Sequence, residues 1–265
     1  MINKKRIVVK VGTSSLTNEI GNPNLKAFDS LALVLSDVHN MGYDIVLVSS
    51  GAIAVGASKL HLKEKPTELR YKQACAAVGQ CSTMFWYDKF FSEYNQEVAQ
   101  ILFNADDLEN EEKKENLSNT INTLLEMGII PIVNENDSVS YTEIDSEEHL
   151  FSDNDKLSAI VAILCKAGKL VIFSDIDGFF DKDPRLYSDA KLIDRIDEIT
   201  DDTFQLAGGA GSRRGTGGMR TKLEAARLAT AQGISTIVTN GAHPDALYSV
   251  VAGRKVGTLF KGNRR

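Results

Sequence analysis

Two lysines and a glycine-rich segment are the features of this sequence that point most directly to chemistry. Lys10 lies in an otherwise apolar run, RIVVKVG (6–12), where a charged side chain must reach water or an anion. The segment GTGGMRTK (215–222) leads into a helical pattern, and such loops bind phosphate because free backbone N–H groups and the helix dipole point at the anion. Lys222 ends this segment. Two cations beside a phosphate-binding loop are typical of phosphoryl transfer, in which positive groups surround the moving phosphoryl group.

The motifs taken one at a time leave several functions open. GTGGMRTK is not a P-loop, because no glycine precedes its lysine, and Arg220 occupies the third glycine position of a dinucleotide-binding G-x-G-x-x-G motif. Asp155 follows Ser152-Asp153-Asn154 at the start of another helical pattern. On spacing alone these residues favour an ordinary helix cap, although a site for magnesium-bound phosphate or for an ammonium group stays open.

Short β-branched runs alternate with longer helical patterns along the whole chain. We expect strands over 6–12, 43–52, 97–103, 129–137, 169–178, 234–240 and 256–260. We expect helices over 25–42, 68–95, 111–127, 153–168, 219–233 and 244–252, and Gly79 marks a point where the second could break. This alternation predicts an α/β fold, a three-layer α/β/α sandwich with a largely parallel central sheet. Because no low-complexity linker divides the chain, we expect one domain over 1–265, with room for two lobes.

Polar residues follow five of the expected strands. They lie at 10–15, 49–52, 134–137, 174–178 and 239–241. In parallel sheets, ligands bind beyond the carboxyl ends of the strands. Glycine, serine, asparagine and aspartate also form ordinary turns, so any single strand end is ambiguous. The five together predict a line of functional groups along one edge of the sheet.

Composition and charge argue against several classes of protein. The net charge is −6 and no basic stripe is present, so a nucleic-acid partner is not expected. The three cysteines have neither redox nor zinc spacing and the four histidines are scattered, so we expect no metal held by protein side chains and a reducing, cytoplasmic setting. No apolar stretch approaches the roughly 20 residues that span a bilayer, and the N-terminus is not a signal peptide, so no membrane association is expected.

Eight segments, in this order along the chain, resemble the glutamate 5-kinases of the amino acid kinase superfamily. They are KVGTS (10–14), VSSGAI (48–53), AAVGQ (76–80), PIVNEND (131–137), DNDKLSA (153–159), SDIDGFF (174–180), DPR (183–185) and GTGGMRTK (215–222). The resemblance covers about residues 5–260. VNEND together with GTGGM-x-TK is similar to glutamate 5-kinases rather than to aspartate or acetylglutamate kinases.

The resemblance implies ATP-dependent phosphorylation of the γ-carboxylate of L-glutamate, the first step of proline biosynthesis. It implies Mg²⁺ carried by ATP, feedback inhibition by L-proline, a homo-oligomer (dimer or tetramer), and a glutamyl-phosphate reductase as partner. Many bacterial members carry a C-terminal PUA domain, which this chain is expected to lack. Residues 144–151 are longer than the family pattern.

The resemblance also implies roles for residues at the matching motif positions. Lys10 and Lys222 would stabilise charge on the transferred phosphoryl group, and Asp155 would organise them. The residues that would bind glutamate are Ser50, Asn134, Asp137 and Asn154. The residues that would bind ATP are Lys10, Ser174, Asp175, Thr216, Gly217, Gly218, Met219, Arg220, Thr221 and Lys222. Because a carboxylate nucleophile is already ionised at neutral pH, no general base is required. The polar stretch 138–152 is a candidate lid.

Three other interpretations stay open. An amino acid kinase for a different acidic substrate would differ in the loop at 134–154, and a substrate panel would separate it. A nucleotide-binding regulatory module without turnover is disfavoured because Lys10 and Lys222 are both present. A dinucleotide-dependent oxidoreductase is disfavoured because no G-x-G-x-x-G follows the first strand.

Overall fold

The computed structural model describes residues 2–18, 20–64, 66–139, 154–207 and 218–263, and the chain divides into two compact units. The first unit combines Met1–Lys10 with Ser152–Arg265, and the second is Val11–Phe151. Each unit has strands of its own covered by its own helices. The expectation of a single kinase domain over 1–265 stays a prediction.

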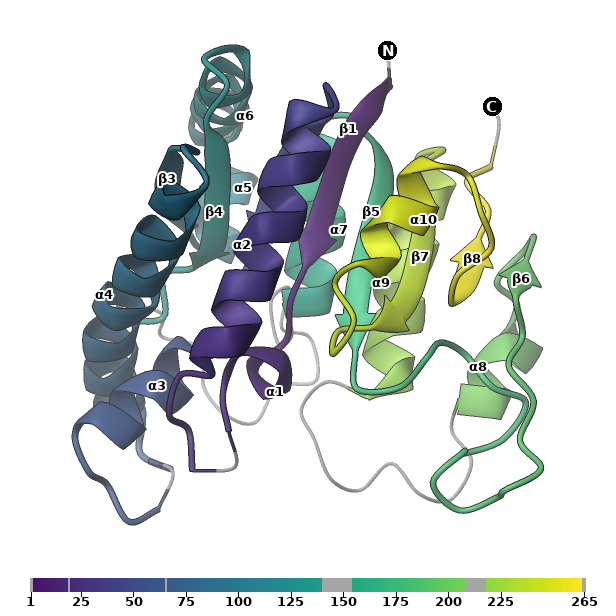
Figure 1. Ribbon diagram of the computed structural model, residues 1–265, viewed down its shortest axis with the longest axis horizontal. Helices are drawn as coiled ribbons and strands as arrows, with labels where there is room; N and C mark the ends of the chain where they lie inside the picture. The colour runs from purple at the N-terminus through teal and green to yellow at the C-terminus, as the bar shows by residue number, and fades with distance from the viewer. Residues whose placement is uncertain (1, 19, 65, 140–153, 208–217, 264–265) are drawn as a thin grey trace. The chain divides into compact units, whose positions relative to one another are not determined.

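The first unit is built on strands in the order β1-β5-β7-β8-β6 (Figure 1). Their bounds are Asn3–Lys10 for β1, Ala167–Ser174 for β5, Ser235–Asn240 for β7, Thr258–Phe260 for β8 and Arg195–Ile196 for β6. β1 pairs with β5 and β5 with β7 in parallel, whereas β7 and β8 are antiparallel. In this register Lys10 lies opposite Ile172, and Ser174 opposite Asn240, so the polar ends of these strands lie at one edge.

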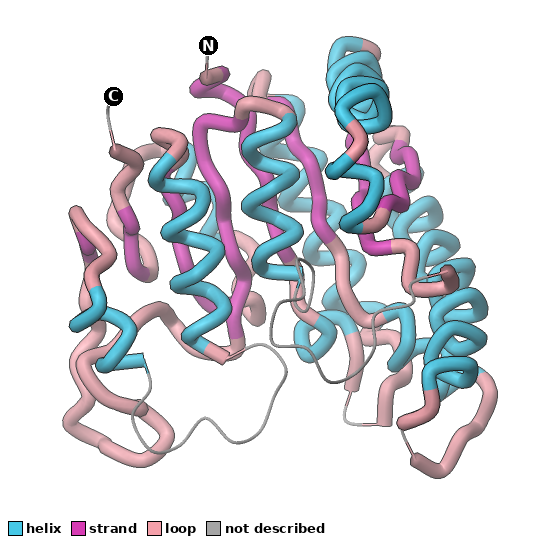
Figure 2. Tube along the Cα trace, turned by 180° about the vertical axis from the view of Figure 1, so that it is seen from behind, coloured by secondary structure: helices cyan, strands magenta, loops and turns pink. Residues whose placement is uncertain are grey.

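Helices cover both faces of this group of strands. Their bounds are Asn154–Leu164 for α7, Asp201–Ala207 for α8, Met219–Ala231 for α9 and Ala246–Val251 for α10. α10 lies in front of the strands in Figure 1, whereas α9 lies on the other face, which Figure 2 shows from behind. α7 and α9 pack on each other, and α7 also packs on β1 and β5. Leu157 and Val161 on α7 are completely buried, as are the central residues of β5.

The described part of the second unit has three parallel strands in the order β3-β4-β2. The strands are β2 (Asp44–Val48), β3 (Val98–Phe103) and β4 (Ile130–Glu135). The helices are α1 (Thr13–Leu16), α2 (Leu25–Asn40), α3 (Ala52–Lys59), α4 (Leu69–Glu93), α5 (Ala105–Glu109) and α6 (Glu111–Glu126). The side chain of Asn24 caps α2 by accepting from the N–H of Ala27, and Asn110 caps α6 in the same way. Figures 1 and 2 show α2 and α6 on opposite faces of the strands.

The break considered at Gly79 is absent, because α4 is continuous from Leu69 to Glu93. Gly79 instead allows α3 to approach α4 very closely. A Cβ atom at Gly79 would lie 1.8 Å from the carbonyl oxygen of Ala52, and one at Gly56 would lie 1.8 Å from that of Cys75. The two glycines therefore remove side chains where the helix backbones touch.

The structure confirms the expected fold class, a largely parallel α/β arrangement with helices on both faces of the strands. Every expected strand and helix is present, with ends that differ by a few residues. Five elements were missed, all of them short: α1, α3, α5, α8 and β6. Among the residues that the structure describes, no helix combines the length and apolar composition needed to cross a membrane.

Candidate active site

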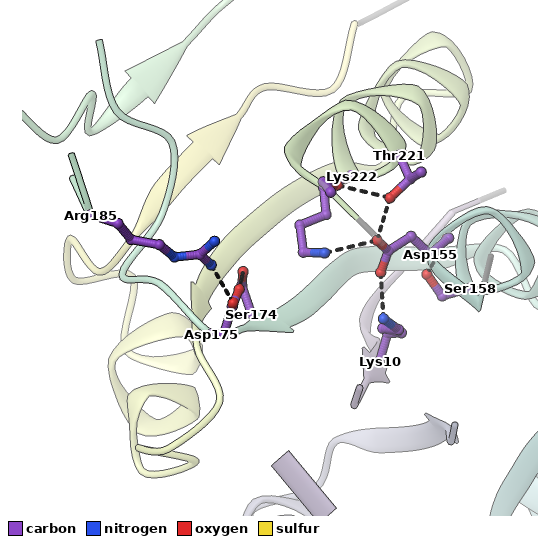
Figure 3. Close-up of polar contacts among 9 residues, drawn as sticks. Lys10, Asp155, Ser158, Ser174, Asp175, Arg185, Thr221 and Lys222 are labelled. Atoms are coloured by element: carbon purple, nitrogen blue, oxygen red, sulfur yellow. Dashed lines mark hydrogen bonds and ion pairs between the residues drawn. The ribbon is translucent and has the colours of Figure 1, made fainter. Parts of the chain in front are cut away.

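The centre of the site is a buried carboxylate held between two lysines (Figure 3). Lys10 is the last residue of β1, Asp155 lies in the first turn of α7, and Lys222 lies in the first turn of α9. The Nζ atom of Lys10 is 2.7 Å from Oδ1 of Asp155, and the Nζ atom of Lys222 is 3.0 Å from Oδ2. All three residues belong to the first unit. The packing of α7 against β1 and α9 brings together residues that are far apart in the sequence.

This cluster places two lysine side chains around one carboxylate in a site with little solvent. Asp155 is 0% exposed, and both lysines are 5% exposed. Burial alone would raise the pKa of the Asp155 carboxyl, but the adjacent charges of Lys10 and Lys222, with their hydrogen bonds, outweigh burial and hold this pKa below its ordinary value. Asp155 is therefore ionised at neutral pH. Among the described contacts, two ammonium groups face one carboxylate, and a pair of cations at this position suits the binding of an anion.

Two hydroxyl groups fix the position of Asp155. Thr221 donates from Oγ1 to Oδ2 of Asp155 at 3.0 Å and also lies 2.9 Å from the carbonyl oxygen of Gly218. Ser158 donates to the backbone carbonyl of Asp155 at 2.5 Å. Thr221 was expected to bind ATP, and its contact with the carboxylate was not foreseen. The role of Ser158 was missed, although it lies within the DNDKLSA motif.

A second polar group lies at the carboxyl end of β5. Ser174 is buried and its Oγ donates to Oδ1 of Asp175 at 3.2 Å. Asp175 is exposed and forms an ion pair with Arg185 through Oδ2 (Figure 3). Nearby in the sequence, Asp177 accepts from the Nδ2 of Asn240, at the end of β7, at 2.8 Å. Arg185 belongs to the DPR motif, but sequence reasoning gave it no role.

The predicted glutamate-binding residues of the second unit lie at one end of its strands. Ser50 follows β2, and Asn134 lies near the end of the adjacent strand β4. Asn134 is 3% exposed, and its Nδ2 donates to Oε1 of Gln80 on α4 at 3.0 Å. Asp137 is half-buried, and burial raises the pKa of its carboxyl to about 6. The fourth predicted residue, Asn154, lies in the first unit as the first residue of α7, next to Asp155.

The glycine-rich segment is described only in part. Thr216 and Gly217 lie outside the described residues, as does most of the candidate lid at 138–152. Gly218 occupies the N-cap of α9, and Met219 begins the helix. Arg220 is exposed and pairs with Glu224 at 3.3 Å. Within the described ranges, no three or more histidine, cysteine, aspartate or glutamate side chains are arranged to hold a metal ion.

Comparison with known proteins shows which family the chain belongs to. Residues 5–240 match the model of the amino acid kinase family. A glutamate 5-kinase of Clostridium perfringens is 55% identical over 258 residues, which are 97% of this chain and 96% of that protein. The chain belongs to the amino acid kinase family, among its glutamate 5-kinases. The resemblance that the motifs indicated is thereby confirmed.

Other members of the family match over nearly the same region. The glutamate 5-kinase of Enterococcus faecalis is 52% identical over 97% of this chain and 94% of its own length. The Caldanaerobacter subterraneus protein of the same name is 47% identical over 96% of this chain, which corresponds to 67% of the longer relative.

Solved structures of two other kinases share the fold at low sequence identity. UMP kinase from Bacillus anthracis has a TM-score of 0.66 at 16% identity, with 98% of this chain and 97% of that chain aligned. Isopentenyl phosphate kinase from T. acidophilum has a TM-score of 0.60 at 18% identity, with 97% of this chain and 100% of that chain aligned. At these identities the likeness shows the fold alone.

Proposed function

We propose that this protein is a kinase that uses ATP to phosphorylate the γ-carboxylate of L-glutamate, giving L-glutamyl 5-phosphate in the first step of proline biosynthesis. The observation that carries the proposal is the buried Lys10–Asp155–Lys222 cluster in a chain 55% identical to a glutamate 5-kinase. Both reactants are anions, so their approach requires cations at the reacting centre.

The reaction needs positive charge near the transferred phosphoryl group and correct placement of the two substrates, but no general base. The γ-carboxylate of glutamate is ionised at neutral pH, so it attacks the terminal phosphorus of ATP without a general base. Lys10 and Lys222 stabilise the negative charge that spreads over the phosphoryl oxygens as the bond to the leaving phosphate breaks. Asp155 sets the separation of the two lysines, because each ammonium group contacts a different oxygen of its carboxylate. Thr221 holds the Oδ2 atom of that carboxylate.

The N-terminus of α9 suits the phosphates of ATP. Gly218 at the N-cap has no side chain to bond the first N–H groups of the helix, which are therefore suited to a phosphate. Ser174 and Asp175, at the carboxyl end of β5, are proposed to bind the nucleoside part of ATP. Mg²⁺ is proposed to bind through the phosphates, since it retains several waters and needs few protein ligands, and it would neutralise charge on the phosphates.

Ser50, Asn134 and Asp137 of the second unit are proposed to hold glutamate, and a role for Asn154, in the first unit, stays a prediction from the resemblance. Hydroxyl and amide groups suit the two carboxylates of glutamate, and the carboxylate of Asp137 suits its α-ammonium group. Feedback inhibition by L-proline, assembly into a dimer or tetramer, a glutamyl-phosphate reductase as partner and a cytoplasmic location remain predictions from the resemblance.

A hydroxamate assay tests the proposal. Purified protein is incubated with Mg²⁺, ATP, hydroxylamine and one of L-glutamate, L-aspartate or N-acetyl-L-glutamate, with and without L-proline. Because hydroxylamine traps acyl phosphates, we expect hydroxamate with L-glutamate and far less with the other acids. A preference for another acid would overturn the substrate assignment. Absence of product with every acid would favour the regulatory module without turnover.

A further inference from the structure

We propose that Gln80 is a positioning residue for the glutamate substrate and acts through the side chain of Asn134. The inference rests on the proposed function and on the expectation that Asn134 binds glutamate. Gln80 ends the AAVGQ motif, to which no role was assigned. All of the residues involved belong to the second unit, so the argument needs no contact outside it.

Side chains on one face of α4 form hydrogen bonds with polar residues at the ends of two neighbouring strands. Gln80 and Tyr87 are seven residues apart on this helix, which places them on the same side, about two turns from one another. Gln80 contacts Asn134 on β4, and the hydroxyl of Tyr87 lies 2.9 Å from Oγ of Ser49, directly after β2. β2 and β4 are adjacent and parallel, so both contacts fall at the same end of the strands.

The close packing of α3 on α4 restrains the position of the α4 backbone that carries these contacts. The backbones of the two helices touch at Gly56 and Gly79, and Gly79 immediately precedes Gln80. Tyr87 is 0% exposed and packs edge-on against Phe28 of α2, with ring centroids 4.8 Å apart. Gln80 therefore projects from a helix that is held on two sides.

The contact between Gln80 and Asn134 sets the orientation of a buried amide. The two ends of an asparagine amide have nearly the same shape but opposite hydrogen-bonding character, since the NH₂ group donates and the oxygen accepts. With Nδ2 of Asn134 directed to Oε1 of Gln80, a flip of the Asn134 amide alone would bring two oxygen atoms together, and only a joint flip of both amides would restore the hydrogen bond. Gln80 thereby couples the orientation of the Asn134 amide to its own, and so restrains which end of Asn134 is presented away from α4. This selection matters for glutamate, whose carboxylates need donors and whose ammonium group needs acceptors.

Steady-state kinetics of three variants test the inference. Gln80→Met keeps the length of the side chain but cannot accept a hydrogen bond, and we expect the KM for glutamate to rise about tenfold. The KM for ATP should stay within about twofold of the wild-type value. Gln80→Glu keeps the accepting oxygen and should retain most of the affinity for glutamate. Thr83→Val is the control, because Thr83 is buried on the same helix and its hydroxyl has no hydrogen-bond partner among the described residues.

A double-mutant cycle shows whether Gln80 acts through Asn134. In an Asn134→Ala background, Gln80→Met should change the KM for glutamate by less than about twofold, because its partner is already gone. Should the double mutant fail to fold, the comparison of Gln80→Met, Gln80→Glu and Thr83→Val still decides the question. An unchanged KM for glutamate in Gln80→Met, or an equal rise in both KM values, would overturn the inference and leave the proposed function intact. A wild-type enzyme without glutamate-dependent turnover would overturn both.

Discussion

The Asp155→Asn variant should lose both stability and turnover while keeping its shape. Asparagine has nearly the same size as aspartate, so packing around the 0% exposed side chain is preserved. The variant removes the only negative charge of the cluster and leaves Lys10 and Lys222 facing a neutral amide. Breaking a buried ion pair by removing one partner costs about 3–5 kcal/mol, because the remaining charge is uncompensated.

This loss corresponds to a measurable shift in thermal stability. For a chain of this size, 1 kcal/mol moves the Tm by roughly 2–4 °C, so the Tm without ligand should fall by about 10 °C in differential scanning calorimetry at pH 7. The matched control is Asp189→Asn, which breaks the exposed ion pair with Lys182 and should leave the Tm nearly unchanged. Turnover in the hydroxamate assay should fall by about 100-fold or more, in the range seen for groups that organise transition-state charge.

The pH dependence provides a second test of the same reasoning. Since the folded-state pKa of Asp155 lies below its ordinary value of 3.8, the stability that its charge contributes is fully present above about pH 4. It is lost as pH falls through the folded-state pKa, where the wild-type carboxyl becomes neutral like the amide. The Tm difference between wild type and Asp155→Asn should therefore be constant near neutrality and narrow in acid. An equal Tm at pH 7, or a difference that grows in acid, would refute the electrostatic account.

Three further predictions concern single groups of the site and the fold. Lys10→Met and Lys222→Ala should each lower kcat at least 100-fold, with smaller changes in either KM; wild-type kinetics in one of them would remove that lysine from the reacting centre. Asp137→Ala should raise the KM for glutamate far more than that for ATP. In the wild type, the KM for glutamate should rise as pH falls through about 6, because the carboxyl becomes neutral and loses its attraction for an ammonium group. Gly79→Ala should lower the Tm sharply in calorimetry, because its Cβ would lie 1.8 Å from a carbonyl oxygen, whereas Gly218→Ala, where no described atom lies within 4 Å of the new Cβ, should leave the Tm close to that of wild type.

Sequence patterns predicted the elements whose periodicity is long and regular, and missed those defined by a few residues. The helix expected over 25–42 is α2 (Leu25–Asn40) almost to the residue, because its apolar residues repeat at helical spacing and Asn24 provides a cap. α3 was missed because AIAVGASK carries no clear helical period and includes a glycine. The strand expected to run into a Ser-Gly turn over 43–52 ends at Val48, and the turn follows it with Gly51 at a positive φ of 99° as the N-cap of α3.

The site was predictable to the extent that its residues lie at strand ends or in recognised motifs. Lys10 was identified because a lysine in an apolar strand must reach water or an anion, and in the structure its partner is the carboxylate of Asp155. Contacts between distant segments have no signal in a single sequence. The hydrogen bond from Asn134 to Gln80 joins residues 54 positions apart, and the one from Thr221 to Asp155 joins residues 66 apart. Only the packing of the helices on the strands brings these pairs together.

Gln80 and Tyr87 anchor α4 to the ends of two strands through their contacts with Asn134 and Ser49. These two anchors limit how the helix can change in length during evolution. Each residue of an α-helix advances the side chains by about 100° around the axis, so adding or deleting one residue between Gln80 and Tyr87 would turn one anchor away from its strand. The same change beyond Phe91 would leave both anchors facing Asn134 and Ser49. Insertions and deletions in natural variants should therefore avoid positions 80–87 and collect towards the C-terminal end of the helix, where the chain can absorb them in the turn before β3.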